Sequence, residues 1–226
     1  MENIPLITII TVSYNAIKTI ENTILSVLNQ TYPNIEYIII DGGSTDGTLD
    51  IIKKYQDRIS YWVSEADKGI YDAMNKGWYI AKKESYILFI GADDKIISLP
   101  SVKFMCNSYN CIIYGEVELY NRTFKSICNW KLRLTNTIHH QALLIPKKIH
   151  IDPPFNLKYC TYADYDFNLR LYLGKNKFVK DIDFKSFALP NGASHLLNIK
   201  EMTNIVKDNE GVLYYFLSYI YLKLLQ

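Results

Sequence analysis

The sequence predicts an α/β fold in which a mostly parallel sheet is flanked by helices, with a smaller second half and a helical C-terminal tail. Two observations lead to this prediction. Over residues 6–97, apolar runs of strand length alternate with segments of helical periodicity, the pattern of a parallel sheet with helical crossovers. Each predicted strand of this region also ends in a polar cluster, and ligands of parallel α/β sheets bind at the carboxyl ends of the strands.

The first half of the chain, residues 1–97, is expected to supply four strands and three helices. Strands are predicted from largely apolar runs at residues 6–14, 35–40, 59–63 and 86–90. Apolar residues at helical spacing predict helices at residues 17–30, 46–55 and 70–82. Pro33 ends the first of these helices, and Thr45 or Asp46 can cap the second.

The second half, residues 98–198, has a different order of elements. It is expected to contain a hairpin (112–119 and 123–127), strands at 139–145 and 184–189, and a helix at 162–173 that Gly174 ends. Pro146, Pro153 and Pro154 bracket a loop. From residue 199 to 226 the chain is predicted to be helical. We find no internal repeat and no low-complexity linker, so we expect one domain with two halves and a tail.

Composition excludes several classes of protein. The chain has 226 residues and a formal net charge of +2 without a long basic run, so nothing indicates a nucleic-acid partner. The four cysteines show no CxxC spacing, which argues against structural zinc and for free thiols. The N-terminus lacks a signal-peptide pattern, and no stretch approaches the roughly 20 apolar residues of a membrane span. We therefore expect a cytoplasmic protein.

The polar clusters at the strand ends are the strongest physical sign of a site. They are 13–15, 41–46, 65–68 and 93–94, and all four lie at the same predicted edge of the sheet. Adjacent carboxylates at the end of a buried strand, as in Asp93 and Asp94, repel each other, and a divalent cation would relieve that conflict. The alternative is a polar loop whose aspartate caps the next helix.

A nucleotide, if one binds, is not held by a standard phosphate loop. No GxGxxG follows the first strand, and no GKS or GKT occurs. Asp41 could accept hydrogen bonds from a base N–H or from ribose hydroxyls, while Gly42 and Gly43 would let a ligand approach the backbone closely. The alternative for this segment is a tight turn with a helix cap.

Five blocks of the first half resemble the signatures of family 2 glycosyltransferases in residue type, order and spacing. They are residues 9–15, 26–36, 40–48, 65–77 and 91–94, so the resemblance covers residues 6 to about 97. It implies a GT-A fold, a nucleotide-sugar donor with a UDP-sugar favoured, and Mn²⁺ or Mg²⁺ at an Asp-x-Asp element that here is Asp93-Asp94.

The resemblance also implies roles for individual residues of the first half. Asp94 would be the direct metal ligand, with Asp93 facing the donor's ribose or sugar and sharing the metal site. The other residues implied in donor binding are Ser13, Tyr14, Asn15, Asp41, Gly43, Ser44, Asp67 and Lys68.

An inverting transfer needs one carboxylate that takes the proton of the acceptor hydroxyl. Asp164 and Asp166 are two residues apart on the predicted helix and so point about 200° apart. Asp166 precedes Arg170 by four residues, the favourable order for an ion pair within a helix. The segment resembles the family's Glu-Asp block, with Ala163 in place of Glu, and the match implies Asp164 as the general base. Compensation of the helix dipole is the alternative for Asp164, and Asp166 is the alternative base.

Three further segments carry weaker expectations. His140 and Gln141 resemble a His-Gln element ahead of the acceptor region, although packing also explains a histidine beside a strand. Residues 191–194 resemble a Gly-Gly-x-Ser turn, with His195 a candidate for a further metal ligand. The tail at 212–225 is apolar nearly all round, which suits an interfacial helix, a helix docked on its own domain, or an interface with a second copy.

The prediction is therefore an inverting glycosyltransferase of bacterial cell-surface polysaccharide assembly (O-antigen, capsule or exopolysaccharide). Its acceptor would be a sugar or a lipid-linked saccharide, and it could lie peripherally on the inner face of the membrane. One alternative is a sugar-phosphate nucleotidylyltransferase, but its basic, glycine-rich loop is missing from residues 13–16. The other is a non-catalytic nucleotide-sugar-binding module, which would have lost the base or the metal pair.

Overall fold

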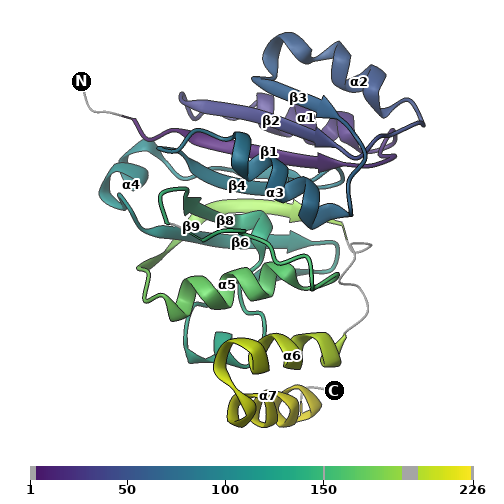
Figure 1. The fold of residues 1–226 in the computed structure, drawn as a ribbon. Coiled ribbons are helices and arrows are strands. Elements are labelled where there is room, and N and C mark those ends of the chain that lie inside the picture. The colour runs from purple at the N-terminus through teal and green to yellow at the C-terminus, as the bar shows by residue number, and fades with distance from the viewer. Residues whose placement is uncertain (1–3, 150, 190–197, 225–226) are drawn as a thin grey trace.

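The computed structural model describes residues 4–149, 151–189 and 198–224. One mixed sheet runs through this part of the chain and joins the two halves (Figure 1). Its strand order is β3-β2-β1-β4-β8-β6-β9-β5, with β7 paired to β6. The α/β fold expected from the alternating pattern is confirmed.

The first half forms the parallel part of the sheet. Its strands are β1 (Ile7–Ser13), β2 (Ile35–Asp41), β3 (Tyr61–Ser64) and β4 (Tyr86–Gly91), and the neighbours in the order β3-β2-β1-β4 are all parallel. The helices between them are α1 (Ile20–Leu28), α2 (Thr48–Lys54) and α3 (Ile70–Ile80). A short 3₁₀ turn, η1 (Gln56–Arg58), precedes β3.

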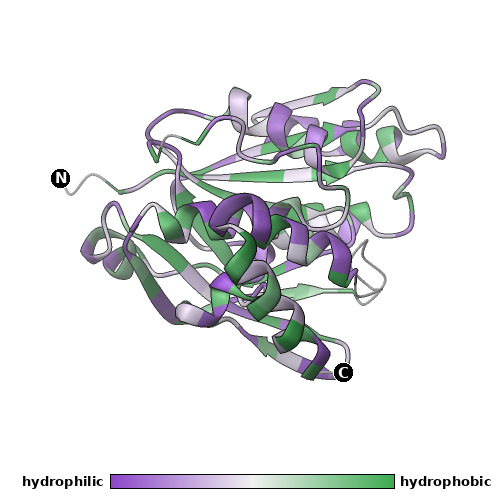
Figure 2. Ribbon diagram, turned by 60° about the horizontal axis from the view of Figure 1, so that its bottom comes forward, coloured by the Kyte–Doolittle hydropathy of each residue, from purple (hydrophilic) through white to green (hydrophobic). Residues whose placement is uncertain are grey.

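Alternate residues of each parallel strand enter two hydrophobic cores. Ile10 and Ile38 pack with α3 in one core, whereas Ile9 and Ile39 pack with α1 and α2 in the other. Side chains of a strand point alternately to the two faces, so near-continuous apolar strands are needed when helices cover both faces. Hydrophobic and hydrophilic stretches alternate along the helices, as expected when only one side of a helix is buried (Figure 2).

The second half adds the remaining strands to the same sheet. They are β5 (Lys95–Ser98), β6 (Ile112–Leu119), β7 (Arg122–Lys125), β8 (Leu143–Pro146) and β9 (Phe178–Ala188). β8 is antiparallel to both β4 and β6 and so connects the two halves. The predicted hairpin is confirmed as the antiparallel pair β6 and β7.

The helices of the second half are α4 (Val102–Asn107) and α5 (Ala163–Leu173), and those of the tail are α6 (Ile199–Glu210) and α7 (Val212–Leu224). Two 3₁₀ turns, η2 (Trp130–Arg133) and η3 (His140–Ala142), lie between β7 and β8. Among the described helices, none is both long and apolar enough to cross a membrane.

Several sequence predictions about the second half are wrong in detail. β5 and α4 are short elements that the sequence did not reveal. Within the predicted strand 139–145, residues 140–142 form η3 instead, and the strand β8 begins only at Leu143. β9 begins at Phe178, six residues before the predicted start, because residues 178–180 pair in parallel with the start of β6. The tail is two helices, since Gly211 adopts a φ of 87° that breaks the helix.

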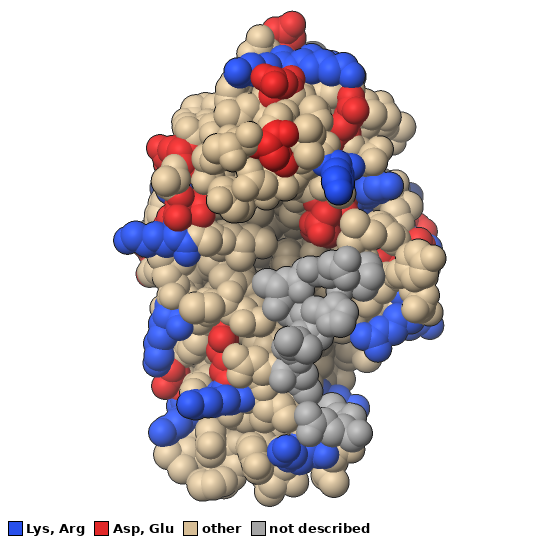
Figure 3. Space-filling model, turned by 90° about the vertical axis from the view of Figure 1, so that its right-hand side faces the viewer, with Lys and Arg blue, Asp and Glu red and all other residues tan. Residues whose placement is uncertain are grey.

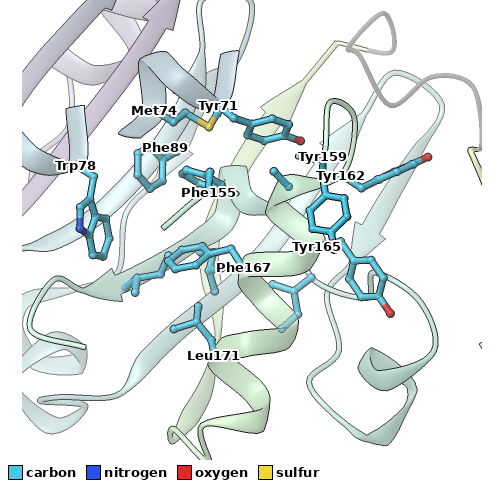
Figure 4. Close-up of a cluster of buried hydrophobic side chains, with 14 of the residues drawn as sticks. Tyr71, Met74, Trp78, Phe89, Phe155, Tyr159, Tyr162, Tyr165, Phe167 and Leu171 are labelled. Atoms are coloured by element: carbon cyan, nitrogen blue, oxygen red, sulfur yellow. The ribbon is translucent and has the colours of Figure 1, made fainter. Parts of the chain in front are cut away.

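An aromatic cluster fixes the position of α5 against α3 and β4. Phe89 of β4 lies edge-on to Phe155 with ring centroids 5.0 Å apart, and Phe155 lies 5.2 Å from Phe167 of α5. Trp78 of α3 stacks on Phe89 at 6.3 Å, and Tyr71 lies 5.4 Å from Phe155 (Figure 4). The first turns of α3 and α5 are therefore held side by side, at the edge of the sheet where the polar clusters gather.

Candidate active site

The carboxyl ends of β1, β2, β3 and β4 form one edge of the sheet. In register, Ser13 lies beside Asp41, and Asp41 lies beside Ser64, so the last residues of three strands are direct neighbours. The face that contains this edge is hollowed, with acidic and basic side chains around the hollow (Figure 3). The structure thus brings together the polar clusters that the sequence placed at strand ends.

Asp41 is fully buried and organises the turn after β2. Its Oδ1 accepts hydrogen bonds from the hydroxyls of Ser13 (2.8 Å) and Ser44 (2.6 Å). Its Oδ2 accepts from the backbone N–H groups of Gly43 (3.0 Å) and Ser44 (2.8 Å) and from the hydroxyl of Ser64 (2.7 Å). Burial acts to raise the pKa of Asp41, but the hydrogen bonds outweigh burial and lower it.

Both oxygens of Asp41 are thus engaged by donors of the chain itself. Asp41 fixes the shape of the loop, and its direct contact with a base or ribose remains a prediction. Asn15 completes the same loop: its N–H donates to Oγ of Ser44 (2.7 Å), and its Oδ1 accepts from the N–H of Thr45 (2.9 Å). Asp46 accepts from the N–H of Thr48 at 3.0 Å and so contacts the start of α2, but Gly47 occupies the cap position, and the predicted cap at Thr45 or Asp46 is wrong.

Tyr14, Gly42 and Asp67 form a second feature of this edge. A Cβ added to Gly42 would lie 2.5 Å from Oδ2 of Asp67 and 3.4 Å from the ring of Tyr14. The side chain of Tyr14 is 66% exposed, whereas Asp67 is half-buried and accepts a hydrogen bond from the N–H of Gly69. Glycine at position 42 therefore makes room for a carboxylate beside an accessible aromatic ring. Such a pair can stack a nucleobase and accept one of its N–H groups. Lys68 is exposed beside it.

Asp93 and Asp94 lie in the tight turn between β4 and β5. Asp94 is 3% exposed, and its Oδ2 accepts hydrogen bonds from the N–H of Gly91 (2.6 Å) and from Nε2 of Gln141 (3.0 Å). A Cβ at Gly91 would lie 2.9 Å from Oδ1 of Asp93 and 3.0 Å from Oδ2 of Asp94, so both carboxylates fold back over this glycine. The hydroxyl of Thr23 in α1 holds the turn by donating to the carbonyl of Asp94 (2.6 Å). A strand follows, so neither aspartate caps a helix.

The electrostatics of this pair fit a divalent cation. Burial, together with the charge of Asp93, raises the pKa of Asp94 to about 6. Next to it, Oε1 of Gln141 is buried without a hydrogen-bond partner among the described residues. Buried carboxylates in mutual repulsion are suitable ligands for Mg²⁺ or Mn²⁺. The described residues contain no cluster of three metal-ligating side chains, and His195 lies outside them.

Asp164 lies in the first turn of α5 and is buried. Its Oδ1 accepts from the hydroxyl of Tyr71 (3.2 Å), and its Oδ2 from Nδ2 of Asn136 (3.2 Å); Nδ1 of His140 lies 3.3 Å from the same Oδ2. Burial acts to raise the pKa of Asp164, but the contact with His140 outweighs it and lowers the pKa. Asp164 is therefore a carboxylate at neutral pH.

The η3 turn links Asp94 and Asp164 through consecutive residues. Gln141 donates to Asp94, and His140 contacts Asp164. Burial acts to lower the pKa of His140, but the contact with Asp164 and the charge of Asp94 raise it. The two acidic centres, about seventy residues apart in sequence, therefore belong to one site.

Asp166 faces away from this site. Its Oδ2 accepts from Nε of Arg170 at 2.8 Å, and its Oδ1 accepts from Nδ2 of Asn209 at 2.9 Å. The ion pair predicted from the spacing of Asp166 and Arg170 is confirmed. Its two oxygens hold α5 and α6 in place, which leaves Asp164 as the carboxylate of α5 that joins the site.

Sequence reasoning missed two partners of Asp164. Tyr71 lies inside the block 65–77, but nothing in that block showed that its hydroxyl would meet a residue of α5. Asn136 carried no signal at all; it is held in turn by Nδ2 of Asn168 at 3.2 Å. Of the histidine pair, only His140 reaches the site, because His139 packs edge-on against Phe124 with centroids 5.2 Å apart.

Comparison with known proteins shows which protein family the first half of the chain resembles. Residues 8–98 match the profile of Glycosyl transferase family 2. A PGL/p-HBAD biosynthesis glycosyltransferase of Mycobacterium bovis is 29% identical over 184 residues, covering 74% of this chain and 70% of the relative. The putative teichuronic acid biosynthesis glycosyltransferase TuaG of Bacillus subtilis is 44% identical over 94 residues, covering 40% of this chain and 37% of TuaG.

Solved structures share the fold at low identity. Residues 1–349 of S. aureus TarS, in complex with UDP-GlcNAc, give a TM-score of 0.69 at 18% identity, over 88% of this chain and 64% of that one. Mannosyltransferase PcManGT from Pyrobaculum calidifontis, in complex with GDP-Man and Mn²⁺, gives a TM-score of 0.57 at 15% identity, over 83% of this chain and 57% of that one. This chain thus spans about three fifths of each solved structure.

Proposed function

We propose that this chain, a member of glycosyltransferase family 2, transfers a sugar from a nucleotide-sugar donor to an acceptor hydroxyl with inversion at the anomeric carbon. The observation that carries the proposal is the link made by η3. Gln141 contacts Asp94 at 3.0 Å and His140 contacts Asp164 at 3.3 Å, so a candidate cation site and a candidate base share one short turn.

The donor would bind along the edge formed by β1, β2 and β3. Tyr14 offers an exposed ring for the base, and Asp67 offers a carboxylate that can accept a base N–H. Asp41, through its hydrogen bonds to Ser13, Ser44 and Ser64, keeps the loop in the shape that leaves this space open. A UDP-sugar is the favoured donor, and the complex of TarS with UDP-GlcNAc supports that choice.

Asp93 and Asp94 would hold a divalent cation, and Mn²⁺ in the PcManGT complex makes manganese the first metal to test. When bound, such a cation neutralises negative charge that develops on a departing diphosphate. Gln141 orients the carboxylate of Asp94 through its hydrogen bond, and the turn held by Thr23 fixes the position of both aspartates.

Asp164 would act as the general base. In the transfer, the acceptor oxygen forms a bond to the anomeric carbon while the bond from that carbon to the diphosphate oxygen breaks. The hydroxyl proton passes to a carboxylate oxygen of Asp164, and the nucleoside diphosphate leaves with the bonding electrons. Tyr71, Asn136 and His140 hold this carboxylate in a fixed orientation and keep it ionised.

The biological setting we propose is the assembly of a bacterial surface glycan, with a sugar or a lipid-linked saccharide as acceptor. The similar glycosyltransferases of PGL/p-HBAD and of teichuronic acid biosynthesis support this class of product.

Incubation of the purified chain with a panel of nucleotide sugars, with and without Mn²⁺, tests the function. We expect slow hydrolysis or binding of one donor, strengthened by the metal and abolished in Asp94→Asn. If no donor bound or turned over, and the metal made no difference, the proposal would be wrong.

A further inference from the structure

Helix α7 has two opposite faces with different surroundings. One face packs on the domain: Ser218 and Leu222 are buried, Oγ of Ser218 donates to the carbonyl of Leu134 at 2.6 Å, and the guanidinium of Arg133 lies 3.9 Å from the ring centre of Tyr214. The helix is therefore docked on its own domain by this face.

The outward face of α7 is apolar. At 100° per residue, seven side chains fall within one arc of about 140° on the side opposite Ser218, and all but Lys223 are apolar. The six apolar ones are Val212 (56% exposed), Leu213 (69%), Phe216 (56%), Leu217 (45%), Ile220 (55%) and Leu224 (81%). A helix on the surface of a globular domain normally turns its polar side to water, so this outward apolar arc requires an explanation.

Tyrosines border the apolar arc on both sides. By the same angles, Tyr219 and Tyr215 lie along one border, and Tyr221 and Tyr214 lie along the other. Tyrosine has an apolar ring and a polar tip, and it concentrates where a membrane meets water. The only charged residue in the sequence of α7 is Lys223, in its last turn. A long lysine stem can lie along lipid while its ammonium group reaches the headgroups.

The charges around this end of the molecule favour an anionic surface. α6 and α7, with the residues that pair to them, carry five cations (Arg133, Lys158, Lys200, Lys207 and Lys223) against three carboxylates (Glu201, Asp208 and Glu210). Each carboxylate has a partner outside its own helix: Glu201 accepts N–H groups at the start of α5, Asp208, which is exposed, pairs with Lys158, and Glu210 pairs with Arg133. Lys200 and Lys207 are exposed.

We propose that the outward face of α7 docks on the interface of an anionic lipid bilayer. The six apolar side chains would enter the boundary between headgroups and acyl chains, the tyrosines would lie at headgroup depth, and the lysines would meet the lipid phosphates. α6 joins this end to the site, because Glu201 accepts the N–H groups of Thr161 and Tyr162 at the start of α5. Docking would bring the first turn of α5, with Asp164, towards acceptors carried by lipid.

A second copy of the chain fits this face less well. A helix of 13 residues is about 20 Å long and about 10 Å wide, a footprint of roughly 200 Å². Stable protein interfaces bury roughly 800 Å² on each partner, and two copies would also bring the same cations together. A bilayer needs no matching shape, and its anionic lipids complement the lysines.

Flotation of the full chain with vesicles tests the proposal. We expect binding to vesicles of phosphatidylcholine mixed with phosphatidylglycerol, weaker binding to phosphatidylcholine alone, and weaker binding at high salt. Phe216→Ser with Ile220→Ser should reduce binding at least about tenfold, because both side chains lose their apolar contact. Lys207→Gln should weaken only the binding to anionic vesicles, by about fivefold.

Ile182→Ser is the matched control, since Ile182 is 67% exposed on β9, away from α7. It should leave vesicle binding unchanged. Leu224→Ser, at an 81% exposed position, serves as a second variant that cannot disturb the core. Absence of vesicle binding by the unaltered chain, or binding that these α7 variants leave intact, would overturn the proposal. So would a dimer in light scattering that the double variant converts to monomer, because the face would then be an interface between copies.

Discussion

Replacement of Asp94 by asparagine should stabilise the metal-free protein while abolishing its metal-dependent binding of donor. Asp94 is 3% exposed, and burial together with Asp93 raises its pKa to about 6 from an unperturbed 3.8. A carboxyl group whose pKa is higher in the folded than in the unfolded state lowers the free energy of unfolding at pH values above its folded-state pKa. At pH values below its unfolded-state pKa it has no such effect, because the group is protonated in both states.

The expected magnitude follows from a pKa of about 6 in place of 3.8, a difference that corresponds to roughly 3 kcal/mol in the free energy of unfolding at pH above 6. Asparagine is close in shape, and its oxygen can still accept the N–H of Gly91. The free energy of unfolding of Asp94→Asn should therefore exceed that of the unaltered chain by about 2–3 kcal/mol near pH 7.5, and by little near pH 4. Added Mn²⁺ should stabilise only the unaltered chain.

Urea denaturation in a chelating buffer at both pH values measures this difference. Asp93→Asn is the matched control: it removes the neighbouring charge but leaves the buried carboxylate, so its stabilisation should be smaller. A variant no more stable than the unaltered chain at neutral pH, or a gain of equal size at both pH values, would refute the electrostatic argument.

Three further outcomes follow from the contacts of the site. Gly42→Ala should raise the KM for the donor severalfold with less than about 1 kcal/mol lost in stability, because the new Cβ displaces only the flexible end of Asp67; steady-state kinetics and thermal unfolding check both. Gln141→Ala should lower kcat about tenfold and weaken metal binding, measured by calorimetry, since the buried carboxylate of the β4–β5 turn loses its orienting partner. Asp166→Asn should cost about 1–3 kcal/mol in urea denaturation through loss of the charge pair with Arg170, yet keep measurable transfer.

The parallel half of the sheet could be predicted because its signals are local. Largely apolar runs rich in β-branched residues identify β1, β2 and β4, and the polar residues that follow each run identify the edge where a ligand is expected. The second half depends on pairing between distant strands. Residues 178–183 contain lysine and aspartate residues, so β9 is recognisable as a strand only through its partner β6.

The candidate site could be predicted only in part, because some of its contacts also join residues that are far apart in the sequence. Asp94 and Asp164 were identified because each stands in a recognisable block of sequence. Tyr71 meets Asp164 across 93 positions, a contact that exists because Phe89, Phe155 and Phe167 pack α5 against α3. No local pattern encodes such a contact.

The hydrogen bonds of Asp41 could also be predicted only in part. The sequence suggested a carboxylate that reaches the donor, and its position at the end of β2 is as expected. The structure gives it five hydrogen-bonding contacts with its own chain. Three come from Gly43 and Ser44 of the same block, whereas those from Ser13 and Ser64 exist because these residues end the neighbouring strands in register, which the block alone does not reveal.

The most direct measurement of the central claim separates donor binding from transfer in Asp164→Asn. The account predicts that this variant binds the donor and Mn²⁺ within about threefold of the unaltered chain, whereas sugar transfer falls by about 10²–10⁴-fold because the general base is lost. Asp166→Asn, two residues along the same helix, is the matched comparison and should keep transfer. Normal transfer by Asp164→Asn, with loss of transfer in Asp166→Asn instead, would contradict the assignment of the base and the central role of η3.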